Sequence, residues 1–280
     1  MDIKYISSSG KEYNLLGEKM RATSGNFHSY SWKTKAKEKA YGSNVYGFMK
    51  ESLSYKLVLT LRGNLDDRKK LLDEIGEAFE EDVAKISPGK FYFGKYYIKG
   101  YVINSVTSPS ELQNYWSQRE IEIFCPYPFW AEEEKISFVK YSEQGSGRFL
   151  DFPYNFPYDY TGTQKGTSIL DNDHYIESDF RMTIFGPVVT PMIIIGGREY
   201  VINVTVEENE YLEVDSKEGS VKRVQANGNV IDEFNNRGFE QSVFTPIPPG
   251  RHTVNWSGDF GFDIILLKER SEPKWIQKNG

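Results

Sequence analysis

The stretch ESDFRMTIFGPVVTPMIIIGG, residues 177–197, alternates apolar and polar side chains, stops at a Gly-Pro pair and resumes after a second proline. Alternation with a period of two is the pattern of a strand that buries one face. Proline has no backbone N–H for a ladder, so these prolines end the pairing of the first strand and turn the chain. The stretch therefore predicts two strands, 179–186 and 191–195, on opposing parts of one β core.

The rest of the second half continues in the same way, with no convincing helix. Further strand candidates are 135–141, 199–206, 210–216, 220–226, 251–257 and 262–270. Turn signals separate them, among them Gly196-Gly197 and the PIPPG run at 246–250. Short strands at regular spacing with such turns predict an antiparallel β-sandwich over residues 133–280.

The first half has a different order of elements, with strands on either side of one helix. Alternating or aromatic segments at 55–63, 90–106 and 115–125 are typical of an antiparallel sheet. Between them, residues 64–85 begin with Asn64 as a helix cap and end before Pro88-Gly89. The apolar positions of this helix form one stripe: Leu71, Leu72, Ile75, Phe79 and Val83.

The sequence changes character at CPYPFWAEEEK, residues 125–135. Two prolines cannot lie in a central strand, and an acidic run follows them at once. We place a domain boundary near residue 132. The first domain is then 1–132, a β domain with the helix at 64–85, and the second is 133–280.

Composition excludes several classes of protein. The chain has 280 residues, a net charge of -6 and a pI near 5.3, so a general nucleic-acid binder is not expected. No apolar run is long enough to span a bilayer, and the first residues lack a signal-peptide core, so we expect a soluble chain without membrane insertion. The lone cysteine, Cys125, fits assembly in a reducing cytoplasm and is interpreted as a buried small hydrophobe.

The sequence lacks the sets of residues that catalytic and metal sites use. His28, His174 and His252 are far apart, and there is no HExxH, Cys pair, GxSxG or Walker motif. The acidic run at 171–179 permits a glycosidase pair or a calcium loop, but a solvated turn is the favoured interpretation. We therefore expect no enzyme, cofactor or metal site.

Two segments invite a binding role. The aromatic run FLDFPYNFPYDY, residues 149–160, would make a glycan-binding cleft or pack its rings on the sandwich or on a neighbouring subunit. Its candidate contact residues are Tyr154, Phe156, Tyr158 and Tyr160. The basic segment KTKAKEKAYGSN, residues 33–44, is expected to be a solvated or subunit-contacting loop.

The order of these pieces resembles the distal tail protein (Dit) family of siphophages. The most specific parts are Pro126–Trp130, the Gly186-Pro187 pair with Pro191, the hairpin at 212–222, and IPPGRHTV at 247–254. The resemblance covers nearly the whole chain. It implies a tail-tube-like N-terminal β domain with one α-helix and a galectin-like C-terminal β-sandwich.

The resemblance also implies a role in the virion, at the distal end of the phage tail. Such proteins form a hexameric ring that joins the tail-tube protein to the tail-associated lysin or fibre hub. The sandwich holds baseplate or receptor-binding proteins, and DNA passes through the ring as cargo. Assembly would take place in the cytoplasm of the bacterial host.

Contacts between subunits are expected at two places in the first domain. One is the 36–48 loop, with Tyr41, Val45, Tyr46 and Phe48, and the other is the exposed face of the 64–85 helix. The alternative function is a carbohydrate-binding sandwich of a host-adhesion device. Sugar-binding galectins use His, Asn and Arg on neighbouring strands, whereas the matching strands here, EYVINVTVEEN and EYLEVDS, lack that set.

Overall fold

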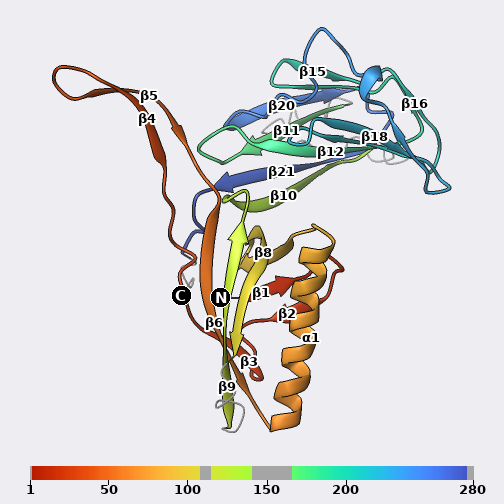
Figure 1. The fold of residues 1–280 in the computed structure, drawn as a ribbon. Helices are drawn as coiled ribbons and strands as arrows, with labels where there is room; N and C mark the ends of the chain where they lie inside the picture. Colours follow the sequence, from red (N-terminus) through yellow and green to blue (C-terminus); the bar gives the residue numbers. More distant parts are fainter. Residues whose placement is uncertain (1, 108–114, 141–165, 276–280) are drawn as a thin grey trace, which may run out of the picture. The chain divides into compact units, whose positions relative to one another are not determined.

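The computed structural model describes residues 2–107, 115–140 and 166–275 (Figure 1). Within these ranges the chain is mainly β with one α-helix, which confirms the predicted fold class. It forms two compact units, Met1–Glu132 together with the residues from Glu269 onward, and Glu133–Lys268. The sequence placed the residues after Lys268 in the second domain, whereas in the structure they group with the first unit.

The first unit is built from two antiparallel sheets that share one strand. The strand orders are β2-β1-β7-β8 and β3-β6-β9-β8, so β8 belongs to both sheets. The elements are β1 (Ile3–Ile6), β2 (Glu12–Asn14), β3 (Met20–Gly25), β4 (Lys33–Glu38), β5 (Ser43–Met49), β6 (Leu53–Arg62), α1 (Leu65–Ala84), β7 (Gly89–Phe93), β8 (Tyr96–Thr107) and β9 (Trp116–Cys125). The predicted segment 90–106 is therefore two strands, because the chain turns at Gly94, between β7 and β8.

Helix α1 begins where the sequence predicts. The side chain of Asn64 accepts a hydrogen bond of 2.8 Å from the backbone N–H of Asp67, as an N-cap does. Leu72, Ile75 and Phe79 are buried in the core of the unit, but Val83 is exposed, contrary to the predicted stripe.

The reason for this difference is a buried carboxylate in the last turn of the helix. Asp82, not Val83, faces inward, where it accepts 2.6 Å and 2.8 Å hydrogen bonds from the hydroxyl of Tyr5 and the backbone N–H of Ser8. Two donors satisfy the buried charge, so a polar residue takes the inward position at the helix end.

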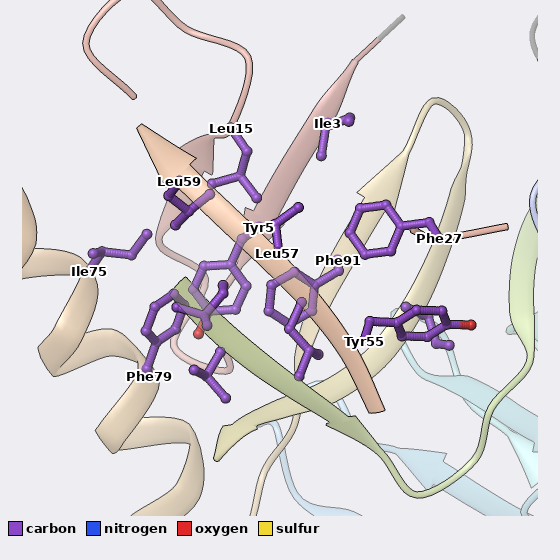
Figure 2. Packing of buried hydrophobic residues seen from close by; sticks show 14 of the residues in the cluster. Ile3, Tyr5, Leu15, Phe27, Tyr55, Leu57, Leu59, Ile75, Phe79 and Phe91 are labelled. Carbon is purple, nitrogen blue, oxygen red and sulfur yellow. The ribbon is translucent and has the colours of Figure 1, made fainter. Parts of the chain in front are cut away.

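The aromatic ring of Tyr5 lies at the centre of this core (Figure 2). Its centroid is 5.0 Å from that of Phe79 on α1 and 4.8 Å from that of Phe91 on β7. Gly89 gives the strand room to approach, because a Cβ atom there would lie 2.4 Å from both Asp82 Oδ2 and Tyr5 Cε2. The helix and β7 therefore meet through Tyr5.

The second unit is a sandwich of two antiparallel sheets, with orders β19-β18-β17-β12-β21-β10 and β11-β20-β14-β15. The chain passes between the units within β10 and again within β21. The strands are β10 (Trp130–Phe138), β11 (Thr167–Asn172), β12 (Asp179–Phe185), β13 (Val188–Val189), β14 (Met192–Ile195), β15 (Arg198–Val201), β16 (Thr205–Val206), β17 (Tyr211–Asp215), β18 (Ser220–Val224), β19 (Val230–Asp232), β20 (Gly250–Trp256) and β21 (Phe262–Arg270).

The stretch 177–197 supplies one strand to each sheet, as its pattern predicts. Strand β12 lies in the larger sheet and β14 in the smaller one, and the alternate residues of both strands share one core. Between them, β13 pairs with β16, which the sequence did not predict. A Cβ atom at Gly186 would lie 1.9 Å from the carbonyl oxygen of Glu207, so the chain must have glycine at this crossing.

Candidate functional site: an exposed hairpin and its root

The segment predicted as a basic loop is a β-hairpin. Within the part of the chain that the structure describes, strands β4 and β5 pair only with each other, and the hairpin extends away from the body of its unit (Figure 1). Nearly every residue of both strands is exposed. Because neither face is buried in the monomer, the alternate positions of residues 33–37 hold lysines and small side chains, not the large apolar residues that would have marked a strand.

A β-bulge sorts the side chains of the hairpin onto two faces. Lys35 pairs with Gly47 and Ala36 with Val45, so Tyr46 is the extra residue. Without the bulge, residues 45 and 48 would point to opposite faces. With it, Val45 and Phe48 lie on the same face, opposite Ala36 and Thr34.

The two faces differ in chemistry. The first carries Thr34, Ala36, Val45 and Phe48, and we call it the apolar face of the hairpin; it ends at the pair of Glu38 and Ser43 beside the turn. The other carries Lys33, Lys35 and Lys37 together with Met49, and Lys33 forms a 2.7 Å ion pair with Glu51. A small hairpin with a basic face and an uncovered apolar face is suited to contact with another protein chain.

All four predicted interface residues of this segment are exposed. Tyr41 is 96% exposed, Tyr46 71%, Phe48 62% and Val45 46%. The structure brings Val45 and Phe48 together, places Tyr46 at the bulge, and leaves Tyr41 in the turn between β4 and β5. Several large apolar side chains exposed close together are uncommon on a soluble monomer and mark a surface for contact with another molecule.

An aromatic cage holds a lysine at the root of the hairpin. The Nζ atom of Lys50, directly after β5, lies 4.2 Å from the ring centroid of Phe129 and 5.4 Å from that of Trp32, directly before β4. Tyr30 adds a third ring at 5.8 Å. The rings of Tyr127 and Phe129 contact each other at 4.9 Å. Cation–π attraction therefore ties both ends of the hairpin to the segment just before β10.

The amine in this cage is held in an apolar setting. Lys50 Nζ is buried and has no hydrogen-bond partner within the described part of the chain. Burial lowers the pKa of the Lys50 ammonium to about 8, although Glu269 nearby acts in the opposite direction. The sequence gives no sign of this cage, because Phe129 is far from Lys50 along the chain and only the fold brings them together.

The predicted glycan-contact residues, Tyr154, Phe156, Tyr158 and Tyr160, lie outside the described residues. The second unit has a separate cavity with a volume of about 750 Å³. Its lining includes Val189, Met192, Asn255, Trp256 and Asp259. The indole N–H of Trp256 donates a 3.1 Å hydrogen bond to the carbonyl of Phe260, which fixes the ring at the cavity wall.

The histidines and the cysteine occupy separate environments. His28 stacks on Trp275 with ring centroids 3.7 Å apart, and a ring nitrogen of His252 lies 2.9 Å from the Pro248 carbonyl oxygen.

Among the described residues, no group of three or more His, Cys, Asp or Glu side chains is placed to hold a metal ion. Over the same residues, no helix is long and apolar enough to cross a membrane. Cys125 is completely buried, as the sequence indicated.

Solved structures identify the fold. The crystal structure of the Dit protein of phage SPP1, described as a paradigm of the hub adsorption apparatus in phages that infect Gram-positive bacteria, matches with a TM-score of 0.61 and 8% identity, over 96% of this chain and 99% of that one. The chain has the fold of a phage distal tail protein.

Two further structures carry the same Dit-like fold. Chains of the phage P2 baseplate in its activated conformation, one with Ca and one with Sr, match with TM-scores of 0.63 and 0.61 and identities of 11% and 12%. Each match covers 97% of this chain and 99% of the other. No protein-family model and no curated protein sequence matches the chain.

Proposed function

We propose that this chain is a structural protein of a phage tail tip. Six copies form a ring that joins the tail tube to the tail-associated lysin or fibre hub and to receptor-binding proteins. The observation that carries the proposal is the Dit-like fold, which extends over 96% of this chain and 99% of the SPP1 Dit chain. A match of both units, end to end, is stronger support than a shared sandwich alone.

The exposed hairpin supports assembly. A ring needs a surface on each copy that stays open until the next copy covers it. The apolar face of the hairpin and the exposed Tyr41 and Tyr46 are such a surface, because leaving them in water costs free energy that contact with a neighbour recovers. The function of the protein is then to hold other tail proteins in position, and DNA passes through the ring.

Oligomeric state and shape test this proposal together. Native mass spectrometry of the purified full-length chain, at concentrations from micromolar to about tenfold above, is expected to give a hexamer. Electron micrographs of the same sample are expected to show a closed ring with a central pore. A chain that stays monomeric throughout this range, and that gives compact particles without a pore, would contradict the proposal.

A second candidate function is binding of a carbohydrate by the sandwich. The cavity of about 750 Å³ favours it, because an indole ring beside the amide of Asn255 and the carboxylate of Asp259 suits a sugar ring with its hydroxyls. A glycan array with the full-length chain tests it, and an Asn255→Ala, Asp259→Ala variant is the matched control. Equal signals from both proteins, or none from either, would contradict binding at this cavity.

A further inference from the structure

The first unit carries a pair of lysines in an unfavourable position. Lys90 on β7 is directly opposite Lys99 on β8 in the antiparallel register. Like charges directly opposite each other destabilise a sheet. Among the residues that the structure describes, no ion pair joins either ammonium to a carboxylate, whereas nearby Lys4 has Glu12 at 3.3 Å. An anion that bound both ammonium groups would offset this repulsion.

The surroundings of this pair suit an anionic oxygen. Lys90 and Lys99 line a groove of about 420 Å³ together with Ser7, Ser8 and Ser87. Hydroxyls and ammonium groups both donate hydrogen bonds to carboxylates. Lys90 Nζ also lies 4.6 Å from the ring centroid of Tyr97, which orients the ammonium without neutralising it.

The outer face of α1 has the opposite charge. Asp73, Glu77 and Glu80 follow one another at helical spacing and are all exposed, so they form one stripe that we call the acidic face of α1. The last turn of the helix has no basic residue. Like charges one turn apart repel one another. Arg119 on β9 donates a 2.7 Å hydrogen bond to the carbonyl of Leu72 and interacts with Asp73 and Glu80, so it offsets part of this cost, and a further cationic partner would relieve the rest.

The lysine pair and the acidic face of α1 point away from each other, although the groove of the lysines reaches the end of α1 through Ser8 and Ser87. Side chains alternate along a strand, so Phe91 points inward while Lys90 beside it points outward. Phe91 contacts Tyr5, which contacts Phe79 of α1. The helix thus covers one side of the core and the lysine pair lies on the other. Complementary surfaces on opposite sides of a subunit are what a head-to-tail ring requires.

We propose that the groove of Lys90 and Lys99 in one copy binds the acidic face of α1 in the next copy. This inference rests on the proposed function and names the contact through which the copies repeat. Carboxylates of the neighbour would neutralise the lysine pair, and the lysines would relieve repulsion along the helix. Both surfaces belong to this chain, so a second copy is the partner.

Charge reversal on each surface tests the contact. Lys90→Glu with Lys99→Glu, and separately Glu77→Lys with Glu80→Lys, are expected to raise the dissociation constant of self-association by about tenfold or more. The chain that carries all four substitutions is expected to recover most of the lost affinity, because the two surfaces have then exchanged their charges. Lys217→Glu with Arg251→Glu, two exposed positions of the second unit, gives the same change in net charge as the reversal of Lys90 and Lys99 and is expected to have no such effect.

Sedimentation velocity of the full-length variants gives the dissociation constants, and circular dichroism checks that each remains folded. Association unchanged by both reversals, in a wild-type chain that does form oligomers, overturns this inference and leaves the proposed function intact. A monomeric wild-type chain overturns both. Inorganic phosphate or DNA that binds the wild-type chain but not the Lys90→Glu, Lys99→Glu variant, with association unaffected, would assign the groove to a free anion and overturn the contact.

Discussion

The ammonium of Lys50 lies 4.2 Å from the centre of the Phe129 ring, so a charged group at the end of β5 is fixed by an aromatic ring just before β10. The hairpin would otherwise be free to swing, since β4 and β5 pair with no other strand of the described chain. The direction in which the hairpin presents its apolar face therefore depends on a cation–π cage at its root.

Replacing Lys50 with methionine is expected to remove a pH dependence of stability. The pKa of Lys50 is about 8 in the folded chain and about 10.4 when exposed. Between these values the unfolded chain binds more protons, so the free energy of unfolding rises as the pH rises from about 8. Urea unfolding at pH 7.5 and pH 9.5 is expected to show this gain in the wild type but not in Lys50→Met. Equal gains in both proteins would show that the lysine is not held in an apolar cage.

Removing the hydroxyl of Tyr5 is expected to destabilise the first unit. In Tyr5→Phe, the buried carboxylate of Asp82 loses a donor that lies 2.6 Å away, and an unsatisfied buried group costs about 1–3 kcal/mol. Tyr13→Phe is the matched control, because the Tyr13 hydroxyl bonds the Glu74 carbonyl at an exposed position. Denaturant unfolding gives the free energy of unfolding of both variants. A decrease in Tyr13→Phe as large as in Tyr5→Phe would contradict the role of Asp82.

The sequence predicted elements that bury one face and missed those that bury none. Alternation revealed β6, β9, β12 and β17, and the cap at Asn64 with its periodic stripe revealed α1. In the hairpin of β4 and β5 lysines alternate with small side chains, not with large apolar ones, since its strands are exposed on both faces. Short strands such as β13 and β19 hold too few residues for a pattern to emerge.

The candidate site was predicted only in part, for a related reason. Exposed aromatic residues in a polar segment indicated an interface, but their arrangement depends on the bulge at Tyr46, which no local rule located. At 171–179 the favoured solvated turn was wrong for Asn172. This residue is completely buried and donates a 2.9 Å hydrogen bond to the carbonyl of Ile247, a partner that only the fold supplies.

Polar substitutions on the apolar face of the hairpin are expected to weaken self-association without destabilising the monomer. Val45→Ser with Phe48→Ser removes apolar area that only a neighbour would cover, so the loss appears in the dissociation constant. Lys35→Ser with Lys37→Ser, on the basic face, is the matched control. Sedimentation velocity and thermal unfolding separate the two effects, and a lowered melting temperature with unchanged association would count against the hairpin as a contact.

The thiol of Cys125 is expected to be inert in the native chain. It is completely buried, and burial raises its pKa to about 12, so the reactive thiolate is scarce near neutral pH. A chromogenic disulfide reagent at pH 8 is expected to label the chain only after urea is added. Rapid labelling of the folded chain would show that β9 opens locally at this position.

Alanine at position 186 is expected to destabilise the sandwich strongly. Its Cβ atom would lie 1.9 Å from the carbonyl oxygen of Glu207, a backbone atom that cannot move aside without shifting the chain directly after β16. Crowding of this kind costs about 1–3 kcal/mol or more. Gly47→Ala is the control, because the nearest atoms there lie 3.9 Å away on the side chain of Lys35. Thermal unfolding is expected to show a markedly lower melting temperature for Gly186→Ala and little change for Gly47→Ala. Equal melting temperatures for Gly186→Ala and the wild type would mean that the backbones of residues 186 and 207 do not approach each other so closely.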